Sequence, residues 1–230
     1  MQWTQNYRDS SERYDQDMAE GLRERKKRET KQRISDIATG LFLERGFLTV
    51  TIADVAEAAD VSVNTVYNYF ATKEDLFLDR SQGVVDRLSR WVRGRDVGES
   101  AAAAVLRELR GEVEAVSPRV GLMKGYARFM KVIQEAPPLR SRLWSIQQEV
   151  QDSLEATLRE ETGADADDTL PALMAGQLNW LHHTVMGSIG REMVQGRDPG
   201  EVSRETLVLL DEMEDLLSEK VLNYAVRAPG

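Results

Sequence analysis

The segment Thr51–Lys73 constrains the fold more than any other part of this 230-residue chain. Its sequence, TIADVAEAADVSVNTVYNYFATK, predicts two short helices joined by a tight turn at residues 60–61. Thr51 and Asp54 form a capping box that starts the first helix, and Ser62 caps the second. Two short helices joined in this way have the layout of a helix-turn-helix, a motif that reads DNA.

The second of these helices has two chemically different faces. Val66 and Phe70 are four residues apart and are expected to face inward. The opposite face carries Val63, Asn64, Tyr67 and Asn68, which can contact base edges and phosphates. Together with the helix starts and a basic segment described below, the candidate DNA-binding residues are Arg25, Lys26, Lys27, Arg28, Thr51, Ser62, Val63, Asn64, Thr65, Tyr67, Asn68, Tyr69 and Lys73.

At this point the chain resembles the TetR family of transcriptional regulators, over about its first third. The resemblance rests on Ile34, Ala38, Leu41-Phe42, Gly46-Phe47, Thr51, Val55-Ala56, Val61-Ser62, Thr65-Val66-Tyr67, Tyr69-Phe70 and Lys73-Glu74-Asp75-Leu76. Two positions depart from the family pattern, because Asp60 stands where Gly is usual and Asn64 where Gly is frequent. Asp tolerates left-handed backbone geometry better than most residues, so the turn should survive, but the family's base preference cannot be carried over to Asn64.

A net charge of −9 is unfavourable for DNA binding if it is spread evenly, but the charge varies along the chain. The basic segment Arg23–Arg33 holds seven Lys and Arg residues against Glu24 and Glu29, just before the helix-turn-helix. Phosphate affinity depends on local charge. We therefore expect part of this segment to contact DNA, with a flexible arm in the minor groove as a more specific version and a solvated charged face as the alternative.

Helical periodicity without any alternating strand pattern predicts an all-α chain of about nine helices. An N-terminal extension (1–29) precedes a three-helix DNA-binding domain (30–76, with its reader at 51–70) and a C-terminal ligand-binding and dimerisation domain (77–230). The remaining predicted helices cover 31–45, 72–93, 101–116, 120–135, 139–161, 167–195 and 199–224.

The penultimate predicted helix carries two apolar or small stripes on nearly opposite sides. One is Met174, Leu178, Leu181, Val185 and Ile189; the other is Gly176, Trp180, His183, Gly187 and Gly190. A helix of this kind must be covered on two sides, and a second subunit can supply one cover. The resemblance implies a homodimer formed by the last two helices, and the candidate interface residues are Gly176, Gly187, Gly190, Leu210, Met213 and Leu217.

Ligand binding has the weakest sequence signal. Met and aromatic residues in the middle helices can line an adaptable apolar pocket, although any one of them can equally be ordinary core. By resemblance, an inducer pocket lies in the C-terminal domain. The candidate lining residues are Met123, Tyr126, Met130, Trp144, Gln147, Gln151, Trp180 and His183.

Other classes of protein are less consistent with these residues. His182 and His183 are adjacent and diverge by about 100° on a helix, so no metal site or cofactor is expected. No H-E-x-x-H, G-x-S-x-G or phosphate-binding Gly loop indicates an enzyme. The absence of Cys and of a long apolar run favours a cytoplasmic protein that does not enter a membrane.

We therefore expect a sequence-specific transcriptional regulator that binds a palindromic double-stranded operator as a homodimer and is released, as a repressor, by an unidentified small molecule. Two alternatives remain at this stage. One is a helical protein-interaction module without specific DNA binding, which would bind no operator more tightly than random duplex; the other is an enzyme, which would show turnover.

Overall fold

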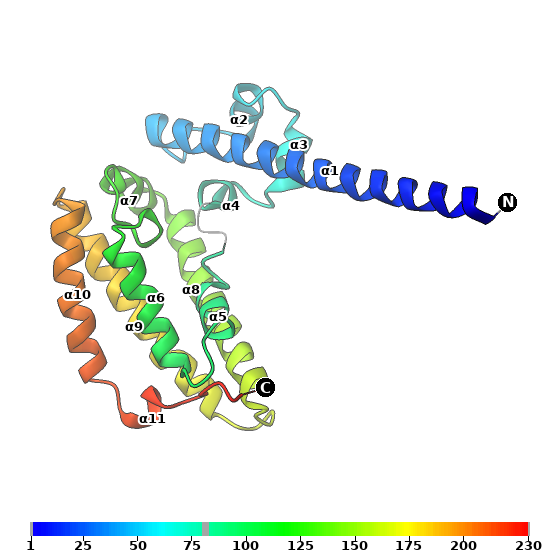
Figure 1. The fold of residues 1–230 in the computed structure, drawn as a ribbon. Coiled ribbons are helices and arrows are strands. Elements are labelled where there is room, and N and C mark those ends of the chain that lie inside the picture. The colour runs from blue at the N-terminus through cyan, green and yellow to red at the C-terminus, as the bar shows by residue number, and fades with distance from the viewer. Residues whose placement is uncertain (1, 80–82, 230) are drawn as a thin grey trace. The chain divides into compact units, whose positions relative to one another are not determined.

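A computed structural model describes residues 2–79 and 83–229, with side chains from Arg23 onward. These residues form eleven α-helices and one 3-10 helix, with no strand among them (Figure 1). The chain divides into two compact units, Met1–Asp79 and Arg80–Gly230, which are described separately below. The all-α prediction is confirmed, and the larger number of helices arises because two predicted helices are divided.

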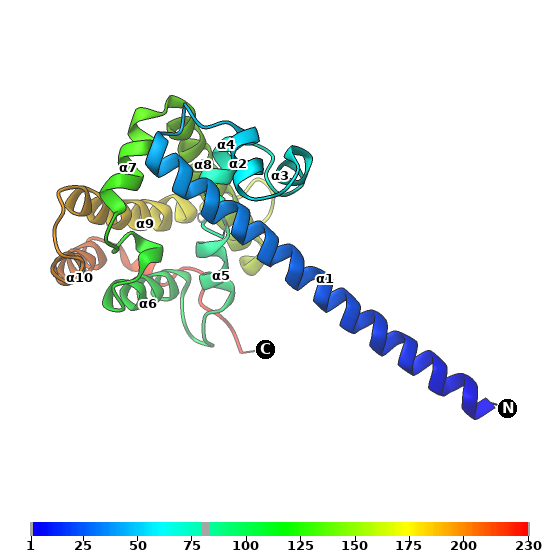
Figure 2. The ribbon, with the colours of Figure 1, turned by 90° about the horizontal axis from the view of Figure 1, so that it is seen from above.

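The first unit contains α1 (Gln2–Arg45), α2 (Ile52–Ala58), α3 (Val63–Tyr69) and α4 (Lys73–Phe77). Helix α1 contacts α2 and α4, and α2 contacts α3. The predicted start of the first helix at Lys31 is wrong, because the backbone is already helical from Gln2 (Figure 2). No Pro or β-branched run interrupts residues 5–29, so the basic segment is helical and is not an extended arm.

An aromatic cluster forms the core of the first unit. The ring centroids of Phe42, Phe47 and Phe77 lie 5.1 to 6.0 Å apart in tilted or edge-on pairs. All three rings are at most 4% exposed. Edge-on aromatic pairs of this kind each add about 0.5–1.5 kcal/mol beyond the burial of their surface. This core fixes α4 against α1 and therefore fixes the start of α4 at Lys73.

Helices α5 (Arg87–Arg93), α6 (Ala101–Glu114), α8 (Pro137–Thr162), α9 (Leu170–Val194) and α10 (Pro199–Asp215) form a bundle in the second unit. Contacts run in a closed ring, from α5 to α6, α10, α9, α8 and back to α5 (Figure 1). Helix α7 (Tyr126–Glu135) contacts both α8 and α9, and α11 (Glu219–Leu222) contacts α6. The bundle interior therefore lies between these helices, where leucines from each are buried.

Three further predicted helices differ from the observed ones. The helix predicted over 72–93 is divided into α4 and α5. Gly83, with φ of +90°, lies in a turn between them. Ser81, which falls within the predicted helix, lies outside the described residues. The helix predicted over 120–135 begins only at Tyr126, because Gly121 and Gly125 have φ near +88° and follow the 3-10 helix η2 (Pro118–Val120). The last predicted helix ends at Asp215, and Ser218 caps the separate α11.

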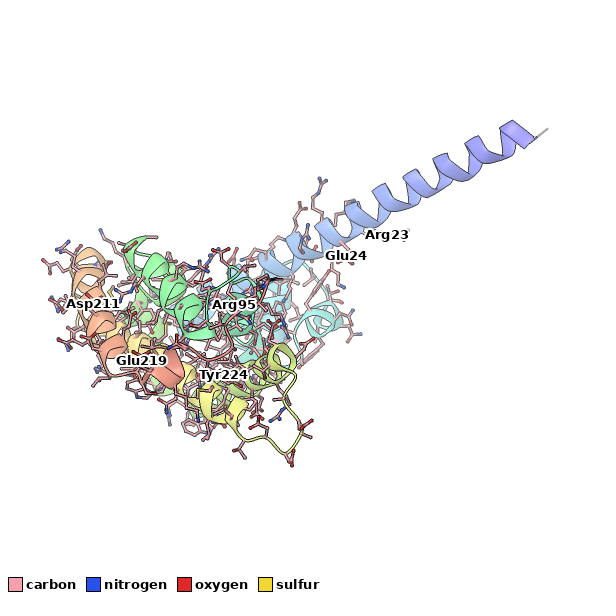
Figure 3. All side chains as sticks on the ribbon, turned by 60° about the horizontal axis from the view of Figure 1, so that its bottom comes forward. Arg23, Glu24, Arg95, Asp211, Glu219 and Tyr224 are labelled. Atoms are coloured by element: carbon pink, nitrogen blue, oxygen red, sulfur yellow. The ribbon has the colours of Figure 1, made fainter. Side chains whose placement is uncertain are left out.

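The chain after α11 forms a C-terminal strap, which we define as residues 224–227. Figure 3 marks Tyr224 at the start of this strap and Arg95 beside it. The Gly98 N–H donates to the Arg227 carbonyl (2.9 Å), the Arg227 N–H donates to Glu99 O (3.0 Å), and the Ala101 N–H donates to Tyr224 O (3.2 Å). These backbone bonds attach the strap to the segment between α5 and α6.

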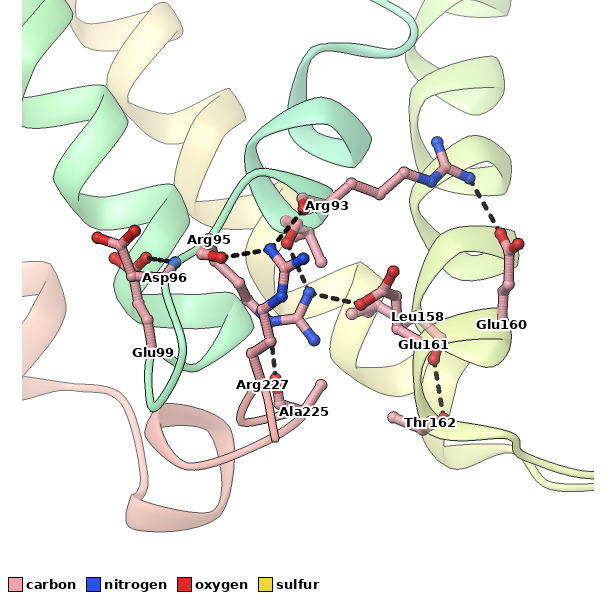
Figure 4. Close-up of polar contacts among 11 residues, drawn as sticks. Arg93, Arg95, Asp96, Glu99, Leu158, Glu160, Glu161, Thr162, Ala225 and Arg227 are labelled. Atoms are coloured by element: carbon pink, nitrogen blue, oxygen red, sulfur yellow. Dashed lines mark hydrogen bonds and ion pairs between the residues drawn. The ribbon is translucent and has the colours of Figure 1, made fainter. Parts of the chain in front are cut away.

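Two arginines complete the attachment of the strap (Figure 4). Arg95 is only 2% exposed; its Nε donates to Ala225 O (3.1 Å) and its Nη1 pairs with Glu161 Oε2 (2.8 Å). Arg227 Nη1 donates to the carbonyl oxygens of Arg93 (3.1 Å) and Arg95 (2.6 Å). The strap thus links the ends of α5 and α8, which are far apart in the sequence.

Candidate nucleic-acid interface

Helix α2 begins at the capping box that the sequence predicts. The Thr51 hydroxyl accepts from the Asp54 N–H (3.2 Å), and Asp54 Oδ2 accepts from both the N–H and the hydroxyl of Thr51 (2.7 Å each). The backbone bond from Thr51 contributes most to lowering the pKa of Asp54, followed by the bond from the Thr51 hydroxyl. The Thr51 hydroxyl is thus already bonded, and a carboxylate stands at the start of α2.

The turn after α2 uses the left-handed geometry expected at Asp60, whose φ is +51°. The Val61 N–H donates to Ala56 O (3.0 Å), which closes the end of α2. Ser62 then caps α3: its Oγ accepts from the Thr65 N–H (3.0 Å) and lies 2.8 Å from the Thr65 hydroxyl. These bonds set the direction of α3, so Ser62 and Thr65 first of all hold the reader in place.

Burial divides α3 into the two faces that its sequence predicts. Val66 is fully buried and Phe70 is 2% exposed. Val63, Asn64, Tyr67 and Asn68, which we call the reading face, are all exposed, Tyr67 by 51%. Tyr69 is half-buried, with its ring centroid 6.5 Å from that of Phe70. The reading face therefore presents two amides, a phenol and a valine to solvent on a helix held from behind.

Lys73, at the first position of α4, lies above the aromatic core. Its Nζ is 4.4 Å from the Phe47 ring centroid and 5.7 Å from that of Phe42. Burial lowers the pKa of Lys73 from its ordinary value of 10.5. Contact with the aromatic faces favours the charged ammonium form of Lys73. This charge lies beside the backbone N–H groups at the start of α4, where it can attract a phosphate oxygen.

The basic segment separates into two groups of residues. Arg23, Arg25, Lys26, Lys27 and Arg28, which we call the five exposed bases, all lie on the solvent-facing part of α1, where Figure 3 marks Arg23 beside Glu24. Arg25 pairs with Glu29, one turn later, at 3.6 Å.

Lys31 and Arg33 instead bind within the first unit. Lys31 Nζ is 2.9 Å from Asp79 Oδ1, and Arg33 Nη1 donates to Ala59 O (2.6 Å). These two residues hold α1 against the rest of the unit.

Exposed polar side chains on a capped helix, next to a run of cations, have the geometry of a helix-turn-helix reader. The model for bacterial regulatory proteins of the tetR family matches residues 34–79, which include the reading face and Lys73. These residues form a DNA-binding domain of the TetR family. The protein is a DNA-binding transcriptional regulator.

Proteins that are similar to this chain are regulators as well. It is 28% identical over 156 residues to the transcriptional regulator TcmR of Streptomyces glaucescens, covering 64% of this chain and 67% of TcmR. It is 44% identical over 62 residues to LuxR of Vibrio harveyi, covering 27% of this chain and 30% of LuxR. The crystal structure of NalD from Pseudomonas aeruginosa is 20% identical and has a TM-score of 0.52, covering 81% of this chain and 97% of NalD. The likeness to NalD supports the fold alone.

The residues proposed for a ligand pocket do not come together as one enclosed site. Trp144 is 66% exposed and Trp180 44% exposed, and His183, also exposed, bonds to Gln147 (Nδ1 to Nε2, 3.0 Å). In the single subunit Trp144, Trp180 and His183 lie on the outer surface of α8 and α9, and Gln147 is half-buried, so their role in a ligand pocket stays a prediction. Gln151 accepts from Asn179 at 3.4 Å and is half-buried.

Met123, Tyr126 and Met130, at the start of α7, are half-buried. Burial raises the pKa of the Tyr126 phenol. A Cβ added at Gly190 would lie 3.3 Å from the Tyr126 hydroxyl, so Gly190 packs within its own chain.

The candidate dimer-interface residues divide into a buried group and a group beside open space. Leu210, Met213 and Leu217 are at most 8% exposed within a single subunit, so the prediction that they face a partner is wrong. A Cβ added at Gly176 would have nothing within 4 Å, and one at Gly187 would meet only the end of Arg191 at 3.6 Å. The exposed large apolar residues of α9 and α10 are instead Leu173, Trp180, Val194 and Val208.

Sequence reasoning missed a buried polar group in the second unit, formed by Arg87, Trp91 and His182. Arg87 and His182 are 9% and 7% exposed. The signal was present, since His182 falls at helical spacing between Leu178 and Val185 on the inward stripe of α9. Within the described part of the chain, no group of three or more His, Asp or Glu side chains could hold a metal ion. None of the described helices is long and apolar enough to cross a membrane.

Proposed function

We propose that this regulator is a homodimeric repressor that binds a palindromic operator and is released by a small molecule. The observation that carries the proposal is the reading face of α3, exposed on a helix whose other side is buried at Val66 and Phe70. Amide side chains read adenine edges in the major groove, and the five exposed bases supply phosphate affinity. We also propose that the protein is cytoplasmic, because it binds DNA.

The homodimer is supported by an apolar surface on the last long helices. Leu173 and Trp180 on α9 and Val208 on α10 are 63%, 44% and 57% exposed. Gly176 and Gly187 leave open space on the same side of α9 as Trp180. Exposed aromatic and aliphatic side chains beside small residues are suited to close packing against a second copy of the helix pair.

Selection of bound duplexes from a random pool tests the proposal. A dimer on a helix-turn-helix site should enrich a palindrome with half-sites about one helical turn, roughly 34–36 Å, apart. An unpaired half-site would contradict the dimer while retaining the reader. Equal recovery of all sequences would contradict specific recognition and favour a protein-interaction module, and turnover of a small molecule would favour an enzyme.

A further inference from the structure

The interior of the second unit holds a positive charge without a carboxylate partner. The Arg87 guanidinium donates from Nη1 to Arg119 O at 3.0 Å, and among the described residues no Asp or Glu oxygen lies within 4 Å of it. Glu112, the nearest source of negative charge, pairs with Arg119 at 3.1 Å. A guanidinium that is 9% exposed normally has its charge compensated, because burying an unpaired charge is costly.

A second unsatisfied group lies beside it. His182 Nε2 is buried and lacks a hydrogen-bond partner within the described residues. Its ring meets Trp91 edge-on, with centroids 6.4 Å apart. Trp91 follows Arg87 by one turn of α5, so both side chains lie on one face of α5, and the Trp91 ring reaches His182 of α9. Two buried groups near each other are therefore incompletely matched: the Arg87 guanidinium lacks a carboxylate, and His182 Nε2 lacks a hydrogen-bond partner.

The protonation state of His182 is consistent with a role as a hydrogen-bond donor. Burial contributes most to lowering the pKa of His182 to about 4, followed by the charge of Arg87 and then that of His183. The imidazole is therefore neutral near pH 7, and one ring nitrogen carries a proton that it can donate. The surroundings are apolar, because Leu88, Leu178 and Val185 are fully buried or nearly so on the adjoining turns.

We infer that Arg87 and His182 bind the carboxylate of a small organic acid whose apolar body packs against Trp91. The inference rests on the proposed function, since it names the chemical class of the effector. The single negative charge of a carboxylate balances the charge of Arg87, and a carboxylate oxygen accepts a hydrogen bond from His182. A phosphate with about two charges would leave one charge uncompensated beside buried apolar side chains. The ligand is therefore a monoanion such as an aliphatic or aromatic carboxylate.

The test measures binding to the full-length protein at pH 7 by calorimetry and by thermal shift, without DNA. The probes are hexanoate, benzoate and salicylate, each paired with its neutral amide. At least one acid should raise the melting temperature while its amide does not. R87M should weaken binding by at least about tenfold, because hydrogen bonds to a charged group are worth about that factor or more. H182F should weaken it as well while preserving the contact with Trp91.

Matched controls lie one turn or one residue away. R90M changes an exposed arginine of the same helix, and H183F makes the same change at the exposed neighbour; both should bind the acids like the wild type. If R87M does not fold, R87K keeps the charge but loses the planar fork, and it should bind more weakly than the wild type. Unchanged affinity in R87M, or in R87K where only that variant folds, overturns the inference. Equal binding of amide and acid, or no binding of any acid, also overturns it.

Failure of this inference is distinguishable from failure of the proposed function. A protein that selects a palindromic operator but binds none of the acids refutes the carboxylate site alone. A protein that binds an acid through Arg87 but selects no DNA sequence refutes the proposed function alone. Release of the operator by the bound acid, lost in R87M, supports both.

Discussion

At the scale of single residues, Lys73 and the two exposed asparagines of α3 should affect DNA binding differently. Lys73→Ala removes a cation beside the start of α4, so affinity for all sequences should fall and the salt slope should decrease by about 1. Asn64→Ala or Asn68→Ala should instead shift the preferred bases, at a cost of about 1–3 kcal/mol at one position. Fluorescence anisotropy with selected and random duplexes over a salt series measures both quantities.

A change in preferred sequence by Lys73→Ala with an unaltered salt slope would contradict this division. Lys73→Arg serves as the control, because it keeps the charge. Lys73→Ala should also lower stability by about 0.5–1 kcal/mol, because the ammonium lies over Phe47 at 4.4 Å.

Asp54 should make the first unit sensitive to acid. Its pKa is lower in the folded chain than the ordinary value of 3.8, mainly because the Thr51 N–H donates to its carboxylate. A lowered folded pKa contributes stability that is present above the unfolded value and is lost as the pH falls through the folded value. Asp54→Asn should therefore flatten the decline of stability below about pH 4, whereas Glu57→Gln, exposed on the same helix, should not. Circular dichroism during urea unfolding between pH 2.5 and 6 tests this; identical slopes for Asp54→Asn and the wild type would refute it.

At the scale of elements, the exposed part of α1 should serve DNA affinity and not folding. Deleting residues 1–29 removes the five exposed bases but keeps the buried Ile34, Ala38 and Phe42 and the Lys31–Asp79 ion pair. The melting temperature should change little, while DNA affinity should fall and the salt slope should decrease by about 0.9 for each lost phosphate contact.

A full-length variant with the five exposed bases changed to Gln separates charge from helix length. It should reproduce the loss of affinity seen in the truncated protein. Equal affinity of the truncated and full-length proteins at low salt would show that the basic segment is only a solvated face.

The C-terminal strap should stabilise the second unit. Arg227→Ala removes two side-chain hydrogen bonds, to the carbonyl oxygens of Arg93 and Arg95. Since Arg227 is solvent-exposed, we expect a loss of about 1 kcal/mol in the free energy of unfolding. Lys220→Ala, exposed on α11, is the control and should cost less than about 0.5 kcal/mol. Equal urea midpoints for the two variants would show that the Arg227 side chain contributes no stability through the strap.

At the scale of the whole molecule, the dimer proposal predicts that Gly187→Leu separates the subunits. A Cβ at position 187 would meet only the flexible end of Arg191 in its own chain, so we expect the monomer to fold. If α9 meets its partner at Gly187, dimer stability and operator binding should fall together, because a dimer must hold its readers about one DNA turn apart. Sedimentation at micromolar concentration gives the result.

Gly111→Leu on α6 makes the same change at a glycine with open space on another helix, and it should remain dimeric. An intact Gly187→Leu dimer with full operator affinity would place Gly187 away from the interface.

The helix-turn-helix was predictable from sequence because its determinants are local. Thr51 with Asp54, Asp60 and Ser62 each act within four residues, and the caps and the left-handed turn appear as expected. The spacing of Val66 and Phe70 likewise determined which side of α3 is exposed. Helical class and the caps at Asp198 and Gly163 follow from the same short-range chemistry.

Tertiary structure decided which apolar and polar residues of the second unit face inward. Trp144 and Trp180 look like core or pocket residues in sequence yet lie on the surface, whereas Leu210 and Met213 are covered by their own subunit. Periodicity identifies the faces of a helix, but which neighbour covers each face depends on contacts between residues far apart in the chain. The ring contact between Trp91 and His182, which are far apart in the sequence, exists only because α5 and α9 line the same interior.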